Sequence, residues 1–417
     1  MRNTVLAVVA VLLVSMLPVR AEGAAQFLPL PLLLPGDSTC FAYAMSSDGK
    51  LVVGESFSAK VTVHGEAALW SNASGNWVVQ GLGLPAAPAG ATNSPAGGIS
   101  AGGTLLVGRS SFGSPTNPPI DTYAWCWQSA AGFRTLPIPS GLIVAQAVST
   151  TEGGTTIAGF GSPDASYRQD SRPMVWRGSY ASGWTGTLLD GNEGWALGVD
   201  MNGNRIVGWS RPANADPSIP GGQARSAALW SWAGGSWTKS WLGSLPADSG
   251  RGTVDMIAPR GHFALGNSGT MDANRPVMWT LLPNGKPAKV EDLGMLPKST
   301  LGIAKAATSN GRRVVGFCSR LEGDEFRYEA FIWERGAGIR SLRELLIAGG
   351  ASGVAGWRNL AATGISDDGN TICGYGTDPS SPEGHDMAWV ATLKEFSLAT
   401  RWGGADPSCE SGRCGFP

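Results

Sequence analysis

The sequence predicts an all-β protein, a seven-bladed β-propeller of four-stranded blades that is closed by the N-terminal strand. Three observations predict it. A turn-and-strand motif occurs seven times at intervals of about 50 residues, an aromatic strand follows each copy, and a strand-like segment precedes the first copy. The 60 Gly and 27 Pro interrupt the chain too often for long helices, while 17 Trp supply apolar surface for a core.

The first residues have the layout of a secretory signal peptide. Arg2 precedes an apolar run over residues 5–14 and small residues around Ala21. The run is shorter than the roughly 20 residues that a membrane span needs. We therefore expect a secreted protein, extracellular or periplasmic, that is a monomer with no membrane span in its mature chain. The expected parts are a signal peptide (1–25), the propeller (26–393) and a C-terminal tail (394–417).

The repeated motif is a small-residue strand, a polar turn that ends in Gly, and an apolar strand with a second Gly five positions later. Asp-Gly and Asn-Gly steps in these turns predict tight two-residue hairpins, because such turns require positive φ angles. Small strands such as 42–44 (Ala-Tyr-Ala) suit a crowded position beside a central axis. The glycine pairs are Gly49 and Gly54, Gly103 and Gly108, Gly154 and Gly159, Gly203 and Gly208, Gly261 and Gly266, Gly311 and Gly316, and Gly369 and Gly374.

The third strand of each unit carries a Trp that we expect to pack between blades rather than to bind sugars, because regular apolar spacing usually marks a core. In the seventh unit Trp389 is displaced by one position, which predicts a bulge or slip. A Leu-Gly-x-Leu-Pro segment is assigned as the fourth strand. Its clear copies are at 82–85, 242–246 and 293–297, and weaker versions lie at 136–137, 188–189 and 342–346.

Closure of the ring follows from the two ends of the repeat region. Residues 28–35 have the fourth-strand composition but precede the first repeat, whereas the seventh unit has no clear segment of this type after Leu393. We therefore expect the N-terminal segment to complete the last blade. A competing interpretation gives this place to residues 394–402.

The turn, the Val-Val-Gly strand, the Ala-x-x-Trp strand and the Leu-Gly-x-Leu-Pro segment together resemble the HAF repeats of bacterial extracellular proteins. The resemblance covers residues 28–393 and is clearest in units one, four and six. It implies export and a propeller-like repeat fold. It brings no established catalytic residues to this chain.

Several motifs that suggest chemistry lack the context that chemistry needs. Ser100 lies in a Gly-x-Ser-x-Gly match but occupies a repeated turn position, so we do not expect a nucleophile. A dinucleotide-type match at 81–86 contains Pro85 and cannot begin a phosphate-binding helix. The three His fall in separate repeats, and the calcium-like stretches at 200–204 and 367–370 coincide with the repeated turn. We therefore expect no metal and no cofactor, and a net charge of -1 excludes a nucleic-acid footprint.

Six cysteines in an exported chain permit disulfides. Cys409 and Cys414 bracket a short polar loop that a disulfide could close. Cys318 and Cys373 lie in corresponding strands but three residues out of register, a separation of about 10 Å that exceeds disulfide reach. We expect that pair to stay reduced.

The loops between the second and third strands vary most in length and charge, and loops on a rigid scaffold commonly carry binding residues. They share one face with the links between blades. Their charges are either solvated or form a polar recognition surface over blades three, six and seven. The candidate binding residues are Tyr167, Arg168 and Asp170 in blade three, Glu322, Asp324, Glu325 and Arg327 in blade six, and Asp378, Glu383 and His385 in blade seven.

We expect a non-enzymatic binding or scaffold module for an extracellular protein or glycan. The alternative is a hydrolase or lyase whose carboxylates converge on the central channel, a common place for ligands. Clustering separates the two hypotheses: an enzyme should bring two of the acidic loop residues, or one of them and His385, into one pocket.

Overall fold

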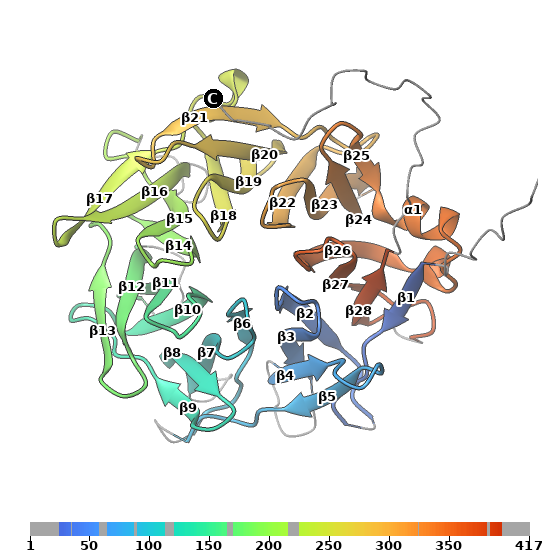
Figure 1. Ribbon diagram of the computed structural model, residues 1–417, viewed down its shortest axis with the longest axis horizontal. Helices are drawn as coiled ribbons and strands as arrows, with labels where there is room; N and C mark the ends of the chain where they lie inside the picture. The colour runs from blue at the N-terminus through green and yellow to red at the C-terminus, as the bar shows by residue number, and fades with distance from the viewer. Residues whose placement is uncertain are drawn as a thin grey trace, which may run out of the picture.

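The computed structural model describes residues 25–393 except 35, 58–64, 87–89, 113–120, 165–169, 216–224, 324 and 382–383. It contains seven antiparallel four-stranded sheets around a central axis (Figure 1), which confirms the predicted seven-bladed propeller. The exceptions to strand and loop in the described residues are the short helix α1 (Leu342–Ala348) and the 3-10 turns η2 (Pro246–Asp248) and η3 (Val354–Gly356). No helix in these residues is long and apolar enough to cross a membrane.

In each blade the first strand named below is the innermost and the last is the outermost. Blades one to four consist of β2 (Cys40–Met45), β3 (Leu51–Ser56), β4 (Glu66–Ser71) and β5 (Val78–Gly81); β6 (Ala96–Ile99), β7 (Leu106–Phe112), β8 (Asp121–Gln128) and β9 (Gly132–Thr135); β10 (Val144–Thr150), β11 (Thr156–Ser162), β12 (Arg172–Ser179) and β13 (Gly183–Leu188); and β14 (Gly194–Val199), β15 (Arg205–Ser210), β16 (Ser226–Ala233) and β17 (Ser236–Trp241). Blades five to seven consist of β18 (Gly252–Ile257), β19 (Phe263–Gly269), β20 (Asn274–Leu281) and β21 (Pro287–Asp292); β22 (Leu301–Ala307), β23 (Arg313–Glu322), β24 (Glu325–Glu334) and β25 (Gly338–Ser341); and β26 (Arg358–Ile365), β27 (Thr371–Thr377), β28 (Asp386–Thr392) and β1 (Gln26–Pro29).

The N-terminal strand closes the ring, as expected. β1 pairs antiparallel with β28, from Gln26 opposite Thr392 to Pro29 opposite Trp389. The predicted bounds of this strand, 28–35, need correction. The observed strand begins at Gln26 and ends at Pro29, and the residues after it belong to the link to blade one. The competing segment 394–402 lies outside the described residues.

The second glycine of each repeat allows close contact between the inner two strands. Every inner pair shifts register at the same place, for example between Ala42 and Ala44, which marks a bulge in the inner strand. A Cβ placed on Gly54 would lie 1.8 Å from the Phe41 carbonyl oxygen. The other six second glycines have equivalent contacts with the neighbouring strand's carbonyl oxygen, at 1.9 to 2.2 Å.

The turn between these strands differs from the predicted two-residue hairpin. Gly49 has φ 71°, but Asp48 is not in the positive-φ region, and Gly49 N donates to Ser46 O at 2.9 Å. This is a type I turn followed by a left-handed Gly. Ser46 Oγ also accepts from Leu51 N at 3.0 Å. The same side-chain contact is made by Ser100, Thr151, Asp200, Thr308 and Ser366. Ser100 and Asp200 therefore stabilise turns.

The repeated Trp residues pack between blades, as predicted. Trp70 is fully buried, and its indole N–H donates to the carbonyl of Pro31 in the link that precedes blade one. Trp176 and Trp279 donate in the same way to carbonyls of the links before their own blades, and Trp230 donates to the Asp190 carboxylate in the link before blade four. The indole thus anchors each of these four blades to its preceding link.

The Trp strand of blade seven, β28, pairs with β27 in regular register, so the predicted bulge or slip in this strand is wrong. Trp389 lies opposite Gly374, whereas Trp70 lies opposite Val52, two positions before the repeat glycine. The Trp is therefore displaced by two positions, which keeps it on the same face of the sheet. Trp125 of blade two occupies the equivalent place opposite Gly108.

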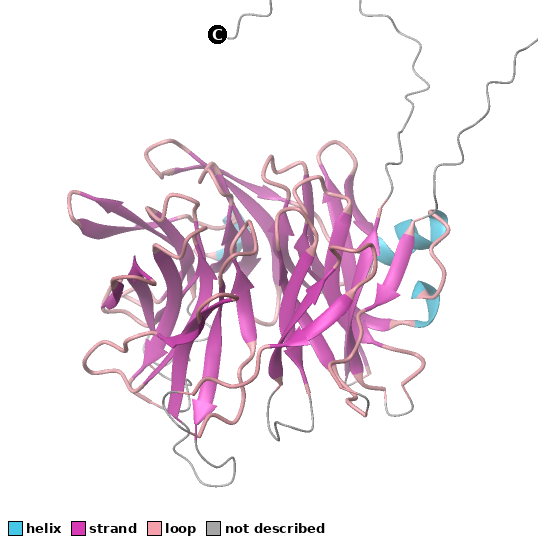
Figure 2. Ribbon diagram, turned by 60° about the horizontal axis from the view of Figure 1, so that its bottom comes forward, coloured by secondary structure: helices cyan, strands magenta, loops and turns pink. Residues whose placement is uncertain are grey.

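Two assignments of the fourth strand need correction. The Leu-Gly-x-Leu-Pro segments follow the outer strands β5, β17 and β21 and form links between blades. Residues 342–346 are not a strand but belong to α1, at the outer rim near β1 (Figures 1 and 2). Its sequence favours a helix, because Ser341 caps Glu344 N at 3.2 Å and Leu342 and Leu346 bury one side.

The four described cysteines, Cys40, Cys126, Cys318 and Cys373, are buried and free. The predicted absence of a disulfide between Cys318 and Cys373 is therefore confirmed. The proposed pair of Cys409 and Cys414 lies outside the described residues.

Candidate binding site in the central channel

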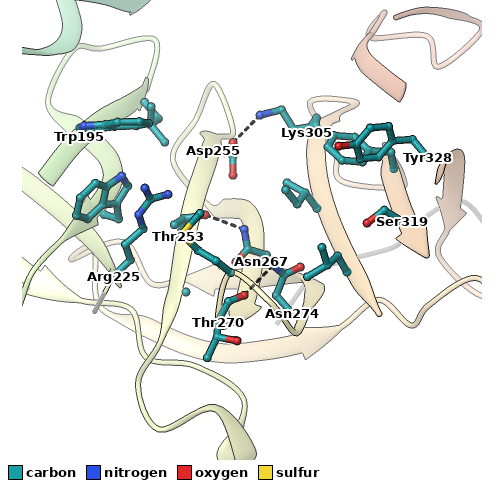
Figure 3. Close-up of a pocket in the computed structure, with 18 residues that line it drawn as sticks. Trp195, Arg225, Thr253, Asp255, Asn267, Thr270, Asn274, Lys305, Ser319 and Tyr328 are labelled. Carbon is teal, nitrogen blue, oxygen red and sulfur yellow. Dashed lines mark hydrogen bonds and ion pairs between the residues drawn. The ribbon is translucent and has the colours of Figure 1, made fainter. Parts of the chain in front are cut away.

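The two faces of the ring differ in what they present. One, which we call the hairpin face, carries the turns between the first and second strands. The other, the loop face, carries the loops between the second and third strands and the links between blades. A cavity of about 440 Å³ opens on the channel wall at the loop face, between blades four, five and six (Figure 3). We call it the channel pocket and define it by Trp195, Arg225, Asp255, Lys305 and Tyr328.

Blade four supplies an aromatic wall. Trp195 is half-buried on the inner strand β14 and stacks on Phe160 of blade three, with ring centroids 4.5 Å apart and planes 11° apart. Trp209 lies behind it on β15, at 5.6 Å, and is 2% exposed. Because Phe160 and Trp209 both pack against Trp195, the position of this ring at the channel is fixed.

Arg225 lies against this wall, immediately before the first residue of β16. Its guanidinium carbon is 4.6 Å from the Trp209 ring centroid and 5.2 Å from that of Trp195, within the range of cation–π attraction. Burial lowers the pKa of the guanidinium, and the charges of Glu193 and Asp255 oppose that shift. The guanidinium forms no hydrogen bond or ion pair with the described part of the chain.

Blades five and six are joined across the pocket by an ion pair. Lys305 Nζ lies 2.6 Å from Asp255 Oδ1 (Figure 3). Burial by itself would lower the pKa of the Lys305 ammonium, but Asp255, as both a charge and a hydrogen-bond acceptor, reverses the shift, and the pKa is raised. Lys305 therefore remains charged at neutral pH, and the Asp255 carboxylate lies beside it as its partner.

The third wall belongs to the hairpin of β23 and β24, each ten residues long. Directly opposed residues of an antiparallel pair share a face. Ser319 opposite Tyr328 and Leu321 opposite Phe326 therefore lie on the face that lines the pocket through Ser319 and Tyr328. Leu321, Phe326 and Tyr328 are 58%, 50% and 38% exposed. This gives the pocket an apolar rim on blade six.

Buried polar atoms without a partner concentrate at the channel pocket. The described residues contain 11 buried side-chain nitrogen or oxygen atoms without a hydrogen bond. Four of them belong to pocket-lining residues: Trp195 Nε1, Trp209 Nε1, Arg225 Nε and Ser319 Oγ. Ser319 is 1% exposed, and Figure 3 shows its hydroxyl pointing into the pocket. Since buried polar groups in folded proteins are nearly always paired, this concentration indicates a site for a polar ligand.

The described predicted residues of blade six, Glu322, Glu325 and Arg327, lie on the other face of the same hairpin. Arg327 pairs with Glu325 at 2.7 Å, and Glu322 pairs with Arg320 at 2.6 Å. Glu322 and Glu325 are opposed in register on the face that includes Cys318 and Glu329, away from the channel pocket. The hairpin is thus part of the site, but through its aromatic rather than its charged side.

The other predicted residues that the structure describes, Asp170, Asp378 and His385, also lie away from the channel pocket. Asp170 is exposed with φ 59° and pairs with Arg172 at 3.5 Å. Asp378 and His385 share the blade-seven loop, where Asp378 N donates to His385 O at 3.3 Å. The structure therefore brings these two together, but neither lines the channel pocket. Tyr167, Arg168, Asp324 and Glu383 lie outside the described residues.

Asp255 and Lys305 were missed, although the repeat marks their position. Both lie six places before the first glycine of their repeat, Gly261 and Gly311. The residue at this position of the repeat is the extra residue of the inner-strand bulge. In blades four to six its side chain lines the channel pocket. The residue six places before the first glycine of each repeat was therefore the available signal. Arg225 lies outside the repeated motif and gives no comparable signal.

The hairpin face has its own cavity of about 1110 Å³. Its wall consists of the repeated turns, which bond to one another, as in Ser47 N to Ala101 O at 2.8 Å. Glu152, its prominent acid, accepts from Gly102 N at 2.6 Å and Thr104 Oγ1 at 2.7 Å. These polar groups hold neighbouring turns together.

No protein-family model matches this sequence, and no curated protein matches it. Among solved structures, the β-propeller domain of the Trilobed protease from Pyrococcus furiosus is similar at 10% identity, covering 88% of this chain and 100% of that one, with a TM-score of 0.48. Puromycin hydrolase matches at 10% identity over 86% of this chain and 59% of its own, with a TM-score of 0.48. A putative TolB from Agrobacterium tumefaciens matches at 11% identity over 85% and 91%, with a TM-score of 0.39. Similarity at this level says nothing about the activity of this chain.

Proposed function

We propose that this chain is a secreted, non-enzymatic propeller of the HAF-repeat type that binds an extracellular glycan in the channel pocket. One observation carries the proposal: four buried polar atoms without a hydrogen bond belong to residues that line a single cavity on the channel. Sugars present both hydroxyl groups and apolar C–H faces. A pocket with aromatic walls and a few polar groups suits such a ligand.

The free groups favour a glycan over a peptide. A bound peptide strand needs a row of backbone partners, because its own backbone amides must be satisfied. The free groups at this pocket are instead side-chain groups: two indoles, a guanidinium and a hydroxyl. Asn267 and Asn274 add amides to the wall, where Asn267 Nδ2 donates to Thr253 Oγ1 at 2.8 Å.

The pocket gives less support to the hydrolase or lyase alternative. Glycoside hydrolysis usually requires two carboxyl groups on either side of the scissile bond. Asp255 is the one carboxylate among the residues that line the channel pocket, and it is paired with Lys305. None of the described acidic residues predicted from the loops lines this pocket.

The test is binding of a panel of neutral and acidic oligosaccharides to the full chain by calorimetry, with product analysis after long incubation. Tyr328→Ala should weaken binding about tenfold, the equivalent of about 1.4 kcal/mol, because it removes an exposed aromatic face of the pocket. Trp241→Ala is the matched control, since Trp241 is 40% exposed on the outer strand of blade four. Equal losses in the two variants, no binding of any panel member, or cleavage of a bound oligosaccharide would contradict the proposal.

A further inference from the structure

Arg225 is a cation that the described protein does not neutralise. The two carboxylates whose charges act on Arg225 are engaged elsewhere: Glu193 lies 3.5 Å from Arg211, and Asp255 lies 2.6 Å from Lys305. Arg225 instead lies against the two indoles of blade four. An unpaired cation that is partly withdrawn from water is unfavourable, and a ligand anion would compensate it.

The net charge of the residues that line the channel pocket indicates how many negative charges the ligand group carries. Its ionised lining residues are Arg225, Lys305 and Asp255, two cations and one anion, so the net charge is +1. Asp255 also lies close enough to influence Arg225 electrostatically. A ligand group with one negative charge balances the pocket, whereas a phosphate dianion would add repulsion from Asp255.

The shape of the donor favours a carboxylate. The guanidinium is planar and presents parallel N–H groups that match the two oxygens of a carboxylate, which makes the pair geometrically specific. The two Trp rings lie within 5.2 Å of the guanidinium carbon and restrict the space in which the side chain can move. Little side-chain entropy is then lost when the carboxylate binds.

We propose that the channel pocket selects an acidic glycan, a uronic-acid oligosaccharide, and that Arg225 binds its carboxylate. The inference rests on the proposed glycan-binding function and names its ligand class. Ser319, on the opposite wall, supplies a buried hydroxyl for the sugar's own hydroxyl groups, and the exposed ring of Tyr328 lies beside it. The cavity of about 440 Å³ limits recognition to one or two sugar units of a longer chain.

The decisive comparison is between uronic acids and their methyl esters, because esterification removes the charge with little change in shape. Trimers of galacturonate, mannuronate and glucuronate, each with its methyl ester, are titrated into the full chain. We expect one acid to bind at least tenfold more tightly than its ester and to lose that preference in Arg225→Gln. Arg225→Lys should restore part of it, since it keeps the charge but not the planar fork.

Arg335→Gln is the matched control, because Arg335 also lies over an indole, 5.4 Å from the Trp333 ring centroid, but outside the channel pocket. It should keep the full preference for the acid. Thermal unfolding without ligand checks the fold: Arg225→Gln should be as stable as the wild type or more so, because it removes an uncompensated charge.

The outcomes separate the two proposals. If each acid and its ester bind equally well, the carboxylate inference is wrong while glycan binding stands. If sulfated trimers bind more tightly than every uronate, the pocket selects a sulfate group, and the assignment of a carboxylate to Arg225 is wrong. If neither acids, esters nor neutral sugars bind, the proposed function itself is overturned.

Discussion

The second glycine of each repeat is fixed by a backbone contact, which explains why the motif is so regular. In blade three, a Cβ on Gly159 would lie 2.0 Å from the Gln146 carbonyl oxygen. The atom it meets belongs to the backbone of the bulged inner strand, so it cannot rotate away as a side chain can. The inner strands can therefore approach the second strands closely wherever this glycine occurs.

Gly159→Ala should lower the free energy of unfolding by about 3 kcal/mol or more, because the added methyl group forces two strands apart. Gly153→Ala in the same blade should change it by less than about 0.5 kcal/mol, since that position is exposed and nothing lies within 4 Å of its Cβ. Urea titrations of both variants provide the measurement. A similar midpoint for the two would show that the inner strand adjusts freely.

At the scale of the strand, the bulge decides which residue of each inner strand reaches the channel. It places Leu197, Asp255 and Lys305 on the pocket wall from three successive blades. The pair of Asp255 and Lys305 therefore links β18 to β22, two strands that are not neighbours in any sheet. Its electrostatic contribution to stability depends on pH.

The pKa of Lys305 is raised in the folded chain above its ordinary value of 10.5. A raised pKa stabilises the fold fully below the unfolded value, and this contribution is lost as pH rises through the folded value. The unfolding free energy of the wild type should therefore fall above about pH 10.5 more steeply than that of an Asp255→Asn, Lys305→Gln double variant. Denaturation curves between neutral and strongly alkaline pH test this. Parallel pH profiles would mean that the pair contributes nothing measurable.

The sequence predicts strands better than it predicts their ends or the site. The number of blades could be predicted because each blade repeats the paired glycines and the Trp. The second glycine allows the two inner strands to approach, and the Trp packs between blades. Residues 342–346 were assigned to a strand because leucine-rich composition does not separate a short helix from a strand; the Ser341 cap separates them. Arg225 could not be found from the sequence, because its role depends on two indoles that belong to other strands.

At the scale of the whole molecule, stability depends on the place where the two ends of the repeat region meet. The core cluster at this junction joins blades six, seven and one, and includes Ala25, Phe27 and Leu30 from the N-terminal segment. Ala25 N also donates to Gly349 O at 2.9 Å, next to the C-terminal end of α1. The N-terminal segment is thus both the outer strand of blade seven and a part of the core that holds three blades together.

Neighbouring residues of β1 test this arrangement. Phe27 is 6% exposed and contacts Trp357 and Trp389 at centroid distances of 5.1 and 5.4 Å, whereas Leu28 is 46% exposed. Phe27→Ala should lower the unfolding free energy by about 3–5 kcal/mol, since it leaves a cavity between two indoles. Leu28→Ala should change it by less than about 0.5 kcal/mol.

Thermal and urea unfolding, followed by tryptophan fluorescence, measure both variants. If β1 closes the ring, Phe27→Ala should lower the stability of the whole propeller in a single transition, because an open blade seven exposes the core of its neighbours on both sides. A separate early transition confined to blade seven, or equal effects of the two substitutions, would mean that β1 is an attached strand whose loss the other six blades tolerate.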